Sequence, residues 1–247
     1  MKSKAAFPKR AIILAAGHGK RMRPITDTIP KPMVNLNGRP LLSHALERLE
    51  SVGVNDVVIN THHFAQKIET YYKNYQGANL MFSRENDLME TGGGVKMALS
   101  MLGNEPFFVI NGDAFWLNGP TDALTRLSAQ WLPEKMDALL MLHSTVDAYG
   151  YDGLGDFLCE ADGRLTRRNE QRVAPWLFAG VQILDPACLR NTPPGPFSLN
   201  WAYNRMLQKD RLYGIIHDGE WFHIGTPDGL DEAERYIKTA FAETKHR

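Results

Sequence analysis

The chain has 247 residues, in which 28 Lys and Arg balance 28 Asp and Glu to give a formal net charge of zero. This balance, with no basic stripe, argues against nucleic acid as a partner, and no stretch reaches the roughly 20 apolar residues of a membrane span. The two cysteines, Cys159 and Cys188, have no metal-type spacing, which fits a reducing cytoplasm.

The first predicted strand is the apolar run at residues 11–16. Continuous apolar character is typical of a buried parallel strand. The run leads into Leu14-Ala-Ala-Gly-His-Gly-Lys-Arg-Met-Arg-Pro24. Small residues let this backbone approach a ligand, and amides in such a turn form a concavity suited to anions. With Lys20, Arg21 and Lys31 nearby, the segment predicts a polyphosphate-binding loop.

Strand and helix patterns alternate through the next part of the chain. Apolar runs predict strands at 57–60, 80–83, 107–110 and 138–143, and helical spacing predicts helices at 41–49 (ended by Gly53), 64–72, 95–102 and 121–131. This rhythm predicts an α/β fold with a Rossmann-like, mixed but mainly parallel sheet flanked by helices. Ligands in such sheets bind beyond the carboxyl ends of the strands.

The rhythm changes near residue 149. Shorter extended pieces, punctuated by Gly and Pro, predict a mixed-sheet insertion with strands at 154–159, 164–168, 176–184 and 212–217 and a helix near 200–208. Thr226 and Pro227 predict the start of a closing helix, because a hydroxyl caps the first free amides and proline suits the first helical position.

The loop pattern L-A-A-G-x-G-x-R-M-x-P, followed by Pro30-Lys31-Pro32, resembles the sugar-1-phosphate nucleotidyltransferases. Two other phosphate loops do not fit. A P-loop needs Ser or Thr after Gly-Lys, where this chain has Arg21, and a dinucleotide fingerprint needs a third glycine, where it has Met22. The missing fingerprint argues against a nicotinamide-dependent oxidoreductase.

The resemblance implies that a nucleoside triphosphate and a sugar 1-phosphate give a nucleoside diphosphate sugar and pyrophosphate. Such a reaction needs alignment and charge neutralisation, part of which Mg²⁺ supplies. By the same resemblance, Arg21 braces the leaving pyrophosphate and Lys31 holds the attacking phosphate. The predicted nucleotide-binding residues are Leu14, Ala15, Ala16, Gly17, His18, Gly19, Lys20, Arg21, Glu85, Thr91 and Gly92.

Two residues are predicted metal ligands. Asp113 follows a strand in Asn111-Gly112-Asp113, where the family has a metal-binding Asp. His223 stands in Trp221-Phe-His-Ile-Gly-Thr-Pro227, where the family usually has a second Asp. Imidazole suits Mn²⁺, Co²⁺ or Zn²⁺ better than Mg²⁺. Three hypotheses follow: His223 binds a softer metal such as Mn²⁺, contacts a phosphate through a metal-bound water, or marks an inactive relative.

The substrate-recognition residues carry weaker patterns. Glu85 falls where many family members have Gln, and a carboxylate can accept the N–H groups of uracil, thymine or guanine, whereas adenine and cytosine fit less well. The glycines after Thr91 predict a loop that lets a base stack near the backbone. The predicted sugar-binding residues are Asn111, Gly155, Glu170 and Gly180. The pair His62-His63 is predicted to be a loop pair and no metal site.

The whole chain, 1–247, is predicted to be one catalytic domain without a C-terminal β-helix. It comprises a nucleotide-binding core at 10–145, a sugar-binding part at 146–225 and a closing helix at 226–247. It most resembles short uridylyltransferases that use UTP and N-acetylmuramic acid 1-phosphate in cell-wall recycling. Guanylyltransferases for mannose or heptose 1-phosphate, thymidylyltransferases for glucose 1-phosphate and a catalytically silent sugar-nucleotide-binding protein are the alternatives. The sequence makes no prediction of oligomeric state.

Overall fold

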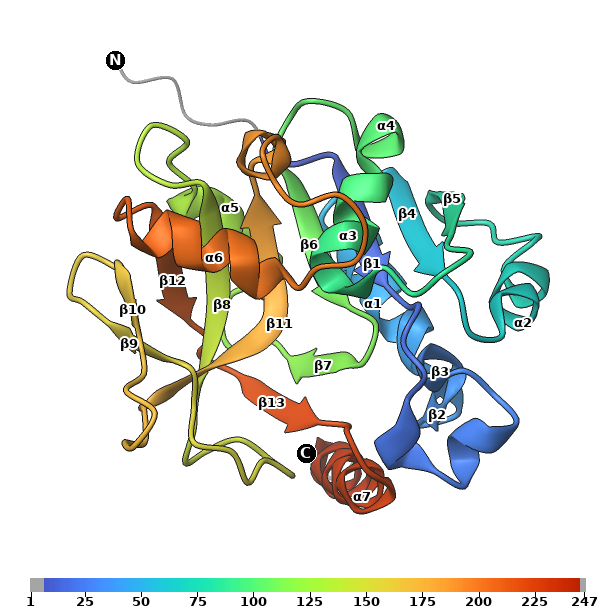
Figure 1. Cartoon of the computed structure of the whole chain (residues 1–247). Coiled ribbons are helices and arrows are strands. Elements are labelled where there is room, and N and C mark those ends of the chain that lie inside the picture. Colours follow the sequence, from blue (N-terminus) through green and yellow to red (C-terminus); the bar gives the residue numbers. More distant parts are fainter. Residues whose placement is uncertain (1–6, 245–247) are drawn as a thin grey trace.

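A mixed sheet of nine strands forms the centre of residues 7–244, the part of the chain that the computed structural model describes, with side chains up to residue 240 (Figure 1). Seven strands follow the order β5-β4-β1-β6-β11-β8-β12, while β9 pairs with β11 and β10 pairs with β9. Their bounds are β1 Arg10–Leu14, β4 Asp56–Thr61, β5 Asn79–Arg84, β6 Phe107–Asn111, β8 Ala138–Ser144, β9 Phe157–Cys159, β10 Leu165–Arg167, β11 Trp176–Leu184 and β12 Leu212–Ile216.

The strands β5, β4, β1 and β6 are parallel, as the apolar runs predict. In their register, Ile13 of β1 lies between Ile59 of β4 and Ile110 of β6. The second half of the sheet is mixed, because β11 runs antiparallel to both β6 and β8, while β12 is parallel to β8. The predicted α/β fold with a mixed, mainly parallel sheet is therefore confirmed.

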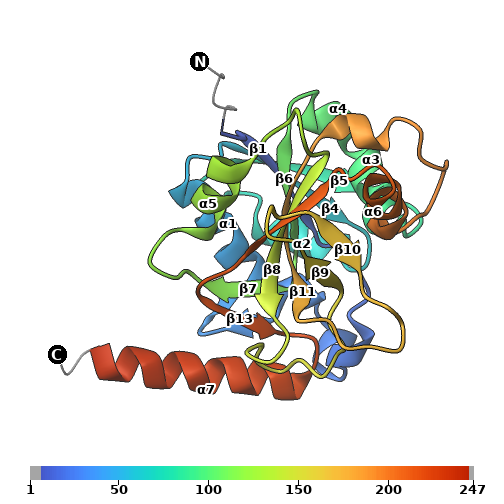
Figure 2. The same cartoon turned by 90° about the vertical axis from the view of Figure 1, so that its left-hand side faces the viewer.

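Helices cover both faces of the sheet (Figure 2). One face packs against α1 and α5 and the other against α3, α4 and α6. Successive residues of β1 serve opposite faces: Ile13 packs with the first pair of helices and Ile12 with the second set. The helices are α1 Leu41–Ser51, α2 Ala65–Tyr71, α3 Glu90–Met97, α4 Leu99–Leu102, α5 Ala123–Gln130, α6 Leu199–Leu207 and α7 Pro227–Thr244.

Most predicted helix ends agree with the structure. Gly53 has a φ of 79°, a conformation that glycine adopts without strain, just after α1. The Thr226 hydroxyl accepts a hydrogen bond from the N–H of Gly229 at 3.2 Å and so caps α7. The helix predicted at 95–102 instead begins at Glu90 and is divided into α3 and α4 at Ala98. None of the helices in the described part is long and apolar enough to cross a membrane.

Short elements connect this framework. Two of them, β7 (Ala114–Leu117) and β13 (Glu220–His223), pair antiparallel as a ribbon that the sequence patterns do not predict. The others are the β2–β3 hairpin (Asn35–Leu36, Arg39–Pro40) and the 3₁₀ turns η1 Lys20–Met22, η2 Ile25–Asp27, η3 Lys31–Met33 and η4 Pro186–Leu189. The β7–β13 ribbon brings residue 223 opposite Ala114, beside Asp113.

His217 contacts this ribbon, and we expect its protonation to make stability depend on pH. Its Nε2 contacts the Leu117 carbonyl oxygen at 3.0 Å, and its Nδ1 is buried without a hydrogen-bond partner among the described residues. Burial lowers the pKa of His217 below 6.5, although the Leu117 hydrogen bond opposes this effect. The unfolded chain, with a pKa near 6.5, therefore binds more protons than the folded chain at acidic pH.

The stabilisation from neutral His217 is fully present above about pH 6.5 and is lost as the pH falls through the lower folded-state pKa. We expect the melting temperature to drop between pH 7.5 and 5.5 by at least about 2 °C more in the native protein than in His217→Gln. Thermal unfolding followed by circular dichroism gives the melting temperatures of both proteins at each pH. Glutamine can still donate to Leu117 and does not titrate, and the other histidines are common to both proteins. Equal drops would contradict the prediction.

Candidate active site

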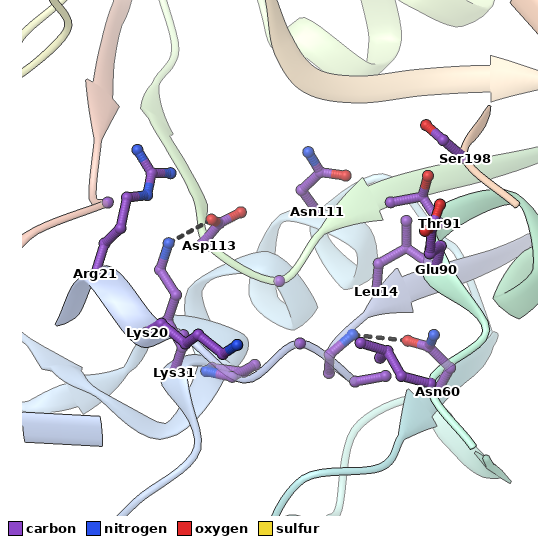
Figure 3. Close-up of a pocket in the computed structure, with 18 residues that line it drawn as sticks. Leu14, Lys20, Arg21, Lys31, Asn60, Glu90, Thr91, Asn111, Asp113 and Ser198 are labelled. Atoms are coloured by element: carbon purple, nitrogen blue, oxygen red, sulfur yellow. Dashed lines mark hydrogen bonds and ion pairs between the residues drawn. The ribbon is translucent and has the colours of Figure 1, made fainter. Parts of the chain in front are cut away.

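A cavity of about 570 Å³ opens at the carboxyl ends of β1 and β6, where the sheet topology predicts a ligand (Figure 3). The phosphate-loop segment and Pro32 form one wall, the segment after β6 the floor, and the start of α3 with Ser198 the other wall. The lining residues are Leu14, Ala15, Ala16, Gly17, Gly19, Lys20, Arg21, Lys31, Pro32, Asn60, Leu88, Glu90, Thr91, Asn111, Gly112, Asp113, Ser198 and Gly225.

The phosphate loop has the geometry of an anion site. Gly19 has a φ of 62°, and a Cβ there would lie 2.9 Å from Cβ of Lys31, so the turn requires glycine. Within residues 7–244, the N–H groups of Gly17, His18 and Gly19 donate to no other group. Free amides in such a turn, beside the exposed Lys20, can surround phosphate oxygens.

His18 itself does not line the cavity. Its ring packs against those of His62 and His63, with centroids 5.8 and 5.0 Å away. The latter two lie between β4 and α2, in a loop as predicted. The backbone N–H of His18 therefore remains a candidate hydrogen-bond donor to phosphate, whereas the His18 side chain packs against the two other histidine rings.

Lys31 and Asp113 form an ion pair inside the cavity, with Nζ 2.5 Å from Oδ2 (Figure 3). The turn η3 positions the lysine, and the loop between β6 and β7 positions the carboxylate. Burial alone would raise the pKa of Asp113, but the Lys31 ammonium outweighs this effect and keeps the pKa below its ordinary value. The carboxylate is therefore ionised at neutral pH and can accept a cation.

His223 lies next to this pair and contacts Arg21. Its Nε2 is 3.4 Å from Nη1 of Arg21, which can only donate, so Nε2 must be the acceptor of this contact. Burial and the positive charges of Arg21 and Lys31 lower the pKa of His223, which favours the neutral ring. A Cβ on Gly225 would lie 2.2 Å from this nitrogen, so glycine leaves room for the imidazole.

The residues present fit Mg²⁺ only in part. Mg²⁺ is commonly held by one or two carboxylates together with substrate phosphates, and Asp113 can supply one carboxylate. The lone pair of His223 Nε2 faces Arg21, so this nitrogen is not free to ligate a metal in the observed arrangement. No set of three His, Cys, Asp or Glu within the described residues is arranged to hold a metal ion. The structure therefore gives no support to Mn²⁺ ligation through Nε2 of His223.

Glu85 requires a correction, because its side chain does not face the cavity. It is 3% exposed, and its two carboxylate oxygens accept hydrogen bonds from Nδ2 of Asn60 at 2.7 Å and from the N–H of Met89 at 2.9 Å. The prediction that Glu85 reads the base directly is therefore wrong for this arrangement. Asn60, which the sequence patterns do not single out, lines the cavity in its place.

Gly92 also requires a correction. Its N–H donates to the Phe197 carbonyl at 2.8 Å, and a Cβ there would lie 2.4 Å from the Phe197 ring. Gly92 therefore packs α3 against the segment before α6 and contributes no surface to the cavity. Thr91 does line the cavity, and its hydroxyl accepts the N–H of Leu199 at 2.9 Å.

This packing predicts different effects of two glycine substitutions on stability. Gly92→Ala forces Phe197 to move, and we expect the melting temperature to fall by about 5 °C. Gly17→Ala is the matched control: its Cβ would have no atom within 4 Å and its φ is unstrained, so the fold should tolerate it. Thermal unfolding compares them, and a Gly92→Ala protein as stable as the control would contradict this account.

Of the four predicted sugar-binding residues, one lines the cavity, a second lies close to that residue, and the other two are not part of the lining. Asn111 lines the cavity, and Gly180, at φ 78°, lies so close to it that a Cβ would be 3.0 Å from Nδ2 of Asn111. Gly155 is buried, and a Cβ there would lie 2.4 Å from the Ala174 carbonyl oxygen. The exposed Glu170 belongs to a loop around the Arg168 guanidinium. The last two do not line this cavity, so the structure adds no support to their prediction as sugar contacts.

Other cavity residues lie outside the sequence predictions. Glu90 has a φ of 57°, which is rare and strained for a residue other than glycine, and such strain is often found at functional sites. Leu88 and Ser198 complete the wall opposite the phosphate loop. The signal that could have indicated this wall is the Met-Glu-Thr segment before the glycines, but no pattern reveals a positive φ at glutamate.

Comparisons with known proteins give the family of this chain. A family model described as "Nucleotidyl transferase" matches residues 10–157. The N-acetylmuramate alpha-1-phosphate uridylyltransferase of Caulobacter vibrioides is 37% identical, over 94% of this chain and 98% of its own. The protein of that name from Neisseria meningitidis is 35% identical, over 91% of this chain and 96% of its own.

Among solved structures, a UDP-glucose pyrophosphorylase complexed with UDP-glucose has the same fold, with a TM-score of 0.79 at 20% identity over 94% of this chain and 99% of that one. The free loop amides, the cavity cations and these sequence matches point to the same kind of protein. The chain belongs to the nucleotidyl transferase family, as a sugar-1-phosphate nucleotidyltransferase.

Proposed function

We propose that the protein transfers a uridylyl group from UTP to N-acetylmuramate 1-phosphate, as a cytoplasmic enzyme of peptidoglycan recycling. The observation that carries the proposal is the match, over nearly the full length of both chains, to two uridylyltransferases for this sugar phosphate. The cavity supports the general chemistry, because it combines anion-binding amides with two lysines, an arginine and an ionised carboxylate.

In the proposed reaction, a phosphate oxygen of the sugar phosphate attacks the α-phosphorus of UTP. The bond between the α-phosphorus and its bridging oxygen to the β-phosphate breaks, and pyrophosphate leaves with that oxygen. The amides of Gly17 to Gly19 hold the polyphosphate, and Arg21 stabilises the charge that develops on pyrophosphate. Lys31 orients the attacking phosphate and reduces its repulsion from UTP.

The proposed cofactor is Mg²⁺, held by Asp113 and by phosphate oxygens of the substrates. When bound, the ion neutralises phosphate charge and fixes the geometry of the α-phosphate. The chain's own contribution is the ionised carboxylate, which Lys31 keeps deprotonated and oriented toward the cavity. Asn111, close to Gly180, is the proposed sugar contact on the same floor.

A pyrophosphate-release assay tests the function. UTP, GTP and dTTP are combined with the 1-phosphates of N-acetylmuramate, N-acetylglucosamine, mannose, heptose and glucose, each with Mg²⁺ and with Mn²⁺. The highest kcat/KM is expected for UTP with N-acetylmuramate 1-phosphate. A dominant GTP or dTTP signal would replace the proposal with guanylyl or thymidylyl transfer. Nucleotide binding without turnover under any condition would identify a silent binding protein.

His223→Asp tests the role of the unusual histidine. The substitution places a second carboxylate beside Asp113 and Arg21, and carboxylates suit Mg²⁺ better than imidazole does. We expect Mg²⁺-dependent turnover to stay within about twofold of the native value or to rise up to about tenfold. Initial rates of pyrophosphate release measure this effect. Complete loss of Mg²⁺-dependent activity in a folded variant would contradict it.

A further inference from the structure

We propose that Asn60 and Glu85 form a positioning pair that holds together the two walls of the nucleotide site. The inference rests on the proposed function, because it concerns how the same cavity binds a nucleoside triphosphate. Both side chains are almost fully buried, at 2% and 3% exposure, and they come from neighbouring strands: Asn60 lies near the end of β4, and Glu85 directly follows β5.

Three hydrogen bonds connect the walls through this pair. On one side, Oδ1 of Asn60 accepts the N–H of Ala15 at 2.7 Å, at the start of the phosphate loop (Figure 3). Between the two side chains, Nδ2 of Asn60 donates to Oε1 of Glu85 at 2.7 Å. On the other side, Oε2 of Glu85 accepts the N–H of Met89 at 2.9 Å, between the cavity residues Leu88 and Glu90.

The chemistry of the pair fixes the direction of the amide. Oε1 of Glu85 accepts from Nδ2 of Asn60 and Oε2 accepts from the N–H of Met89, so the NH₂ group of Asn60 faces Glu85. The amide oxygen must then face Ala15, which is the orientation that holds the phosphate loop. Gly94 makes room for this arrangement, because a Cβ there would lie 2.6 Å from Nδ2 of Asn60 and 2.7 Å from Oε1 of Glu85.

Stability alone gives no reason for a buried carboxylate here. The Glu85 side chain has no ion-pair partner within the described residues, and its carboxylate oxygens accept hydrogen bonds only from a side-chain amide and a backbone N–H. Burial of a carboxylate with neutral donors alone is unfavourable compared with a neutral pair. The geometry connects this carboxylate to both walls of the cavity, which makes it a positioning residue for the triphosphate and no direct contact of the base.

Three variants test the pair. In Glu85→Gln, the glutamine has a single acceptor oxygen for the two N–H donors, Asn60 and Met89, so one of the two hydrogen bonds is lost. Asn60→Asp keeps the bond to Ala15 but places two carboxylates against each other. The double variant, Asn60→Asp with Glu85→Gln, can restore all three bonds, because the new glutamine donates to the new aspartate and still accepts from Met89. It also keeps the total charge of the pair.

Two ligands separate positioning from base reading: UTP and inorganic triphosphate, which has no base. Calorimetry on the full chain with Mg²⁺ gives the dissociation constants, and steady-state kinetics give KM for the sugar 1-phosphate. Each single variant is expected to weaken binding of both ligands by about tenfold, and the double variant to restore native affinity within about threefold. The KM for the sugar 1-phosphate should change by less than about twofold, which a distortion spread over the whole cavity would not produce.

Several results would overturn the inference. Weaker UTP binding with unchanged triphosphate binding in Glu85→Gln would mean that Glu85 reads the base. Unchanged binding in both single variants, or additive losses in the double variant, would mean that the two residues do not act as a pair. If a single variant fails to fold, the other and the double variant still decide. A native chain that binds triphosphate but not UTP would contradict the proposed function while the pair remains testable.

Discussion

Replacement of Lys31 by methionine is expected to lower kcat/KM for the sugar 1-phosphate by about a thousandfold. Methionine keeps an apolar stem of similar length but removes the charge that stabilises the phosphates in the transition state. The side chain of Lys31 is only 12% exposed, so water cannot easily replace the ammonium. Rates of pyrophosphate release, measured at varied concentrations of each substrate, give the size of the loss and show whether it lies in kcat.

Lys238→Met is the matched control for Lys31. Lys238 pairs with Glu234 at 2.8 Å on the exposed surface of α7, with 69% of its side chain accessible. A surface pair of this kind contributes little to stability, so activity should stay within about twofold of the native value. If Lys31→Met retained kcat/KM within tenfold of this control, Lys31 would not hold the attacking phosphate.

Asp113→Asn should cause a loss of similar size, about a thousandfold in kcat with Mg²⁺. The amide keeps the shape of the side chain but removes the negative charge that would hold the cation. It also leaves the Lys31 ammonium without its 2.5 Å partner, so two functions of the cavity change together. Binding of Mn²⁺ in the presence of UTP, followed by electron paramagnetic resonance, separates a metal defect from misplacement of Lys31.

Asp56→Asn provides the control for Asp113. The two side chains have nearly equal exposure, 37% and 38%, but Asp56 lies at the start of β4 and contacts Arg10 at 3.9 Å. We expect this variant to keep native turnover and native Mn²⁺ binding. Unchanged Mn²⁺ binding in Asp113→Asn, together with native activity, would contradict the assignment of Asp113 to the cation.

The parallel core could be predicted because its strands are short apolar runs buried on both faces. Residues 11–16 and 107–110 illustrate this, and the loops at their carboxyl ends gave the phosphate loop and Asp113. The β7–β13 ribbon could not be predicted, since β7 is only four residues long and pairs with a strand about a hundred residues later. Because this pairing could not be predicted, the contact between His223 and Arg21 could not be predicted from the sequence either.

The error at Glu85 has a different cause. The prediction rested on the resemblance, since Glu85 falls where many family members have Gln, and on the ability of a carboxylate to accept the N–H groups of a base. The deciding fact is the amide of Asn60, whose position depends on the alignment of β4 beside β5. The three glycines at 92–94 could not be interpreted fully from the sequence for the same reason. Their spacing indicated a backbone loop, but the residues packed against them, Phe197, Gly195 and Asn60, come from distant parts of the chain.

The antiparallel strand β11 has a consequence for how the protein can be made. The match to the family model ends at residue 157, but β6 gains its second neighbour only through β11, where Val181 pairs with Ile110. A fragment that stopped at 157 would leave the buried strand β6 as an open, apolar edge, which favours aggregation. During translation, the same edge stays exposed until residues 176–184 have left the ribosome, so we expect soluble expression to require the chain through β11.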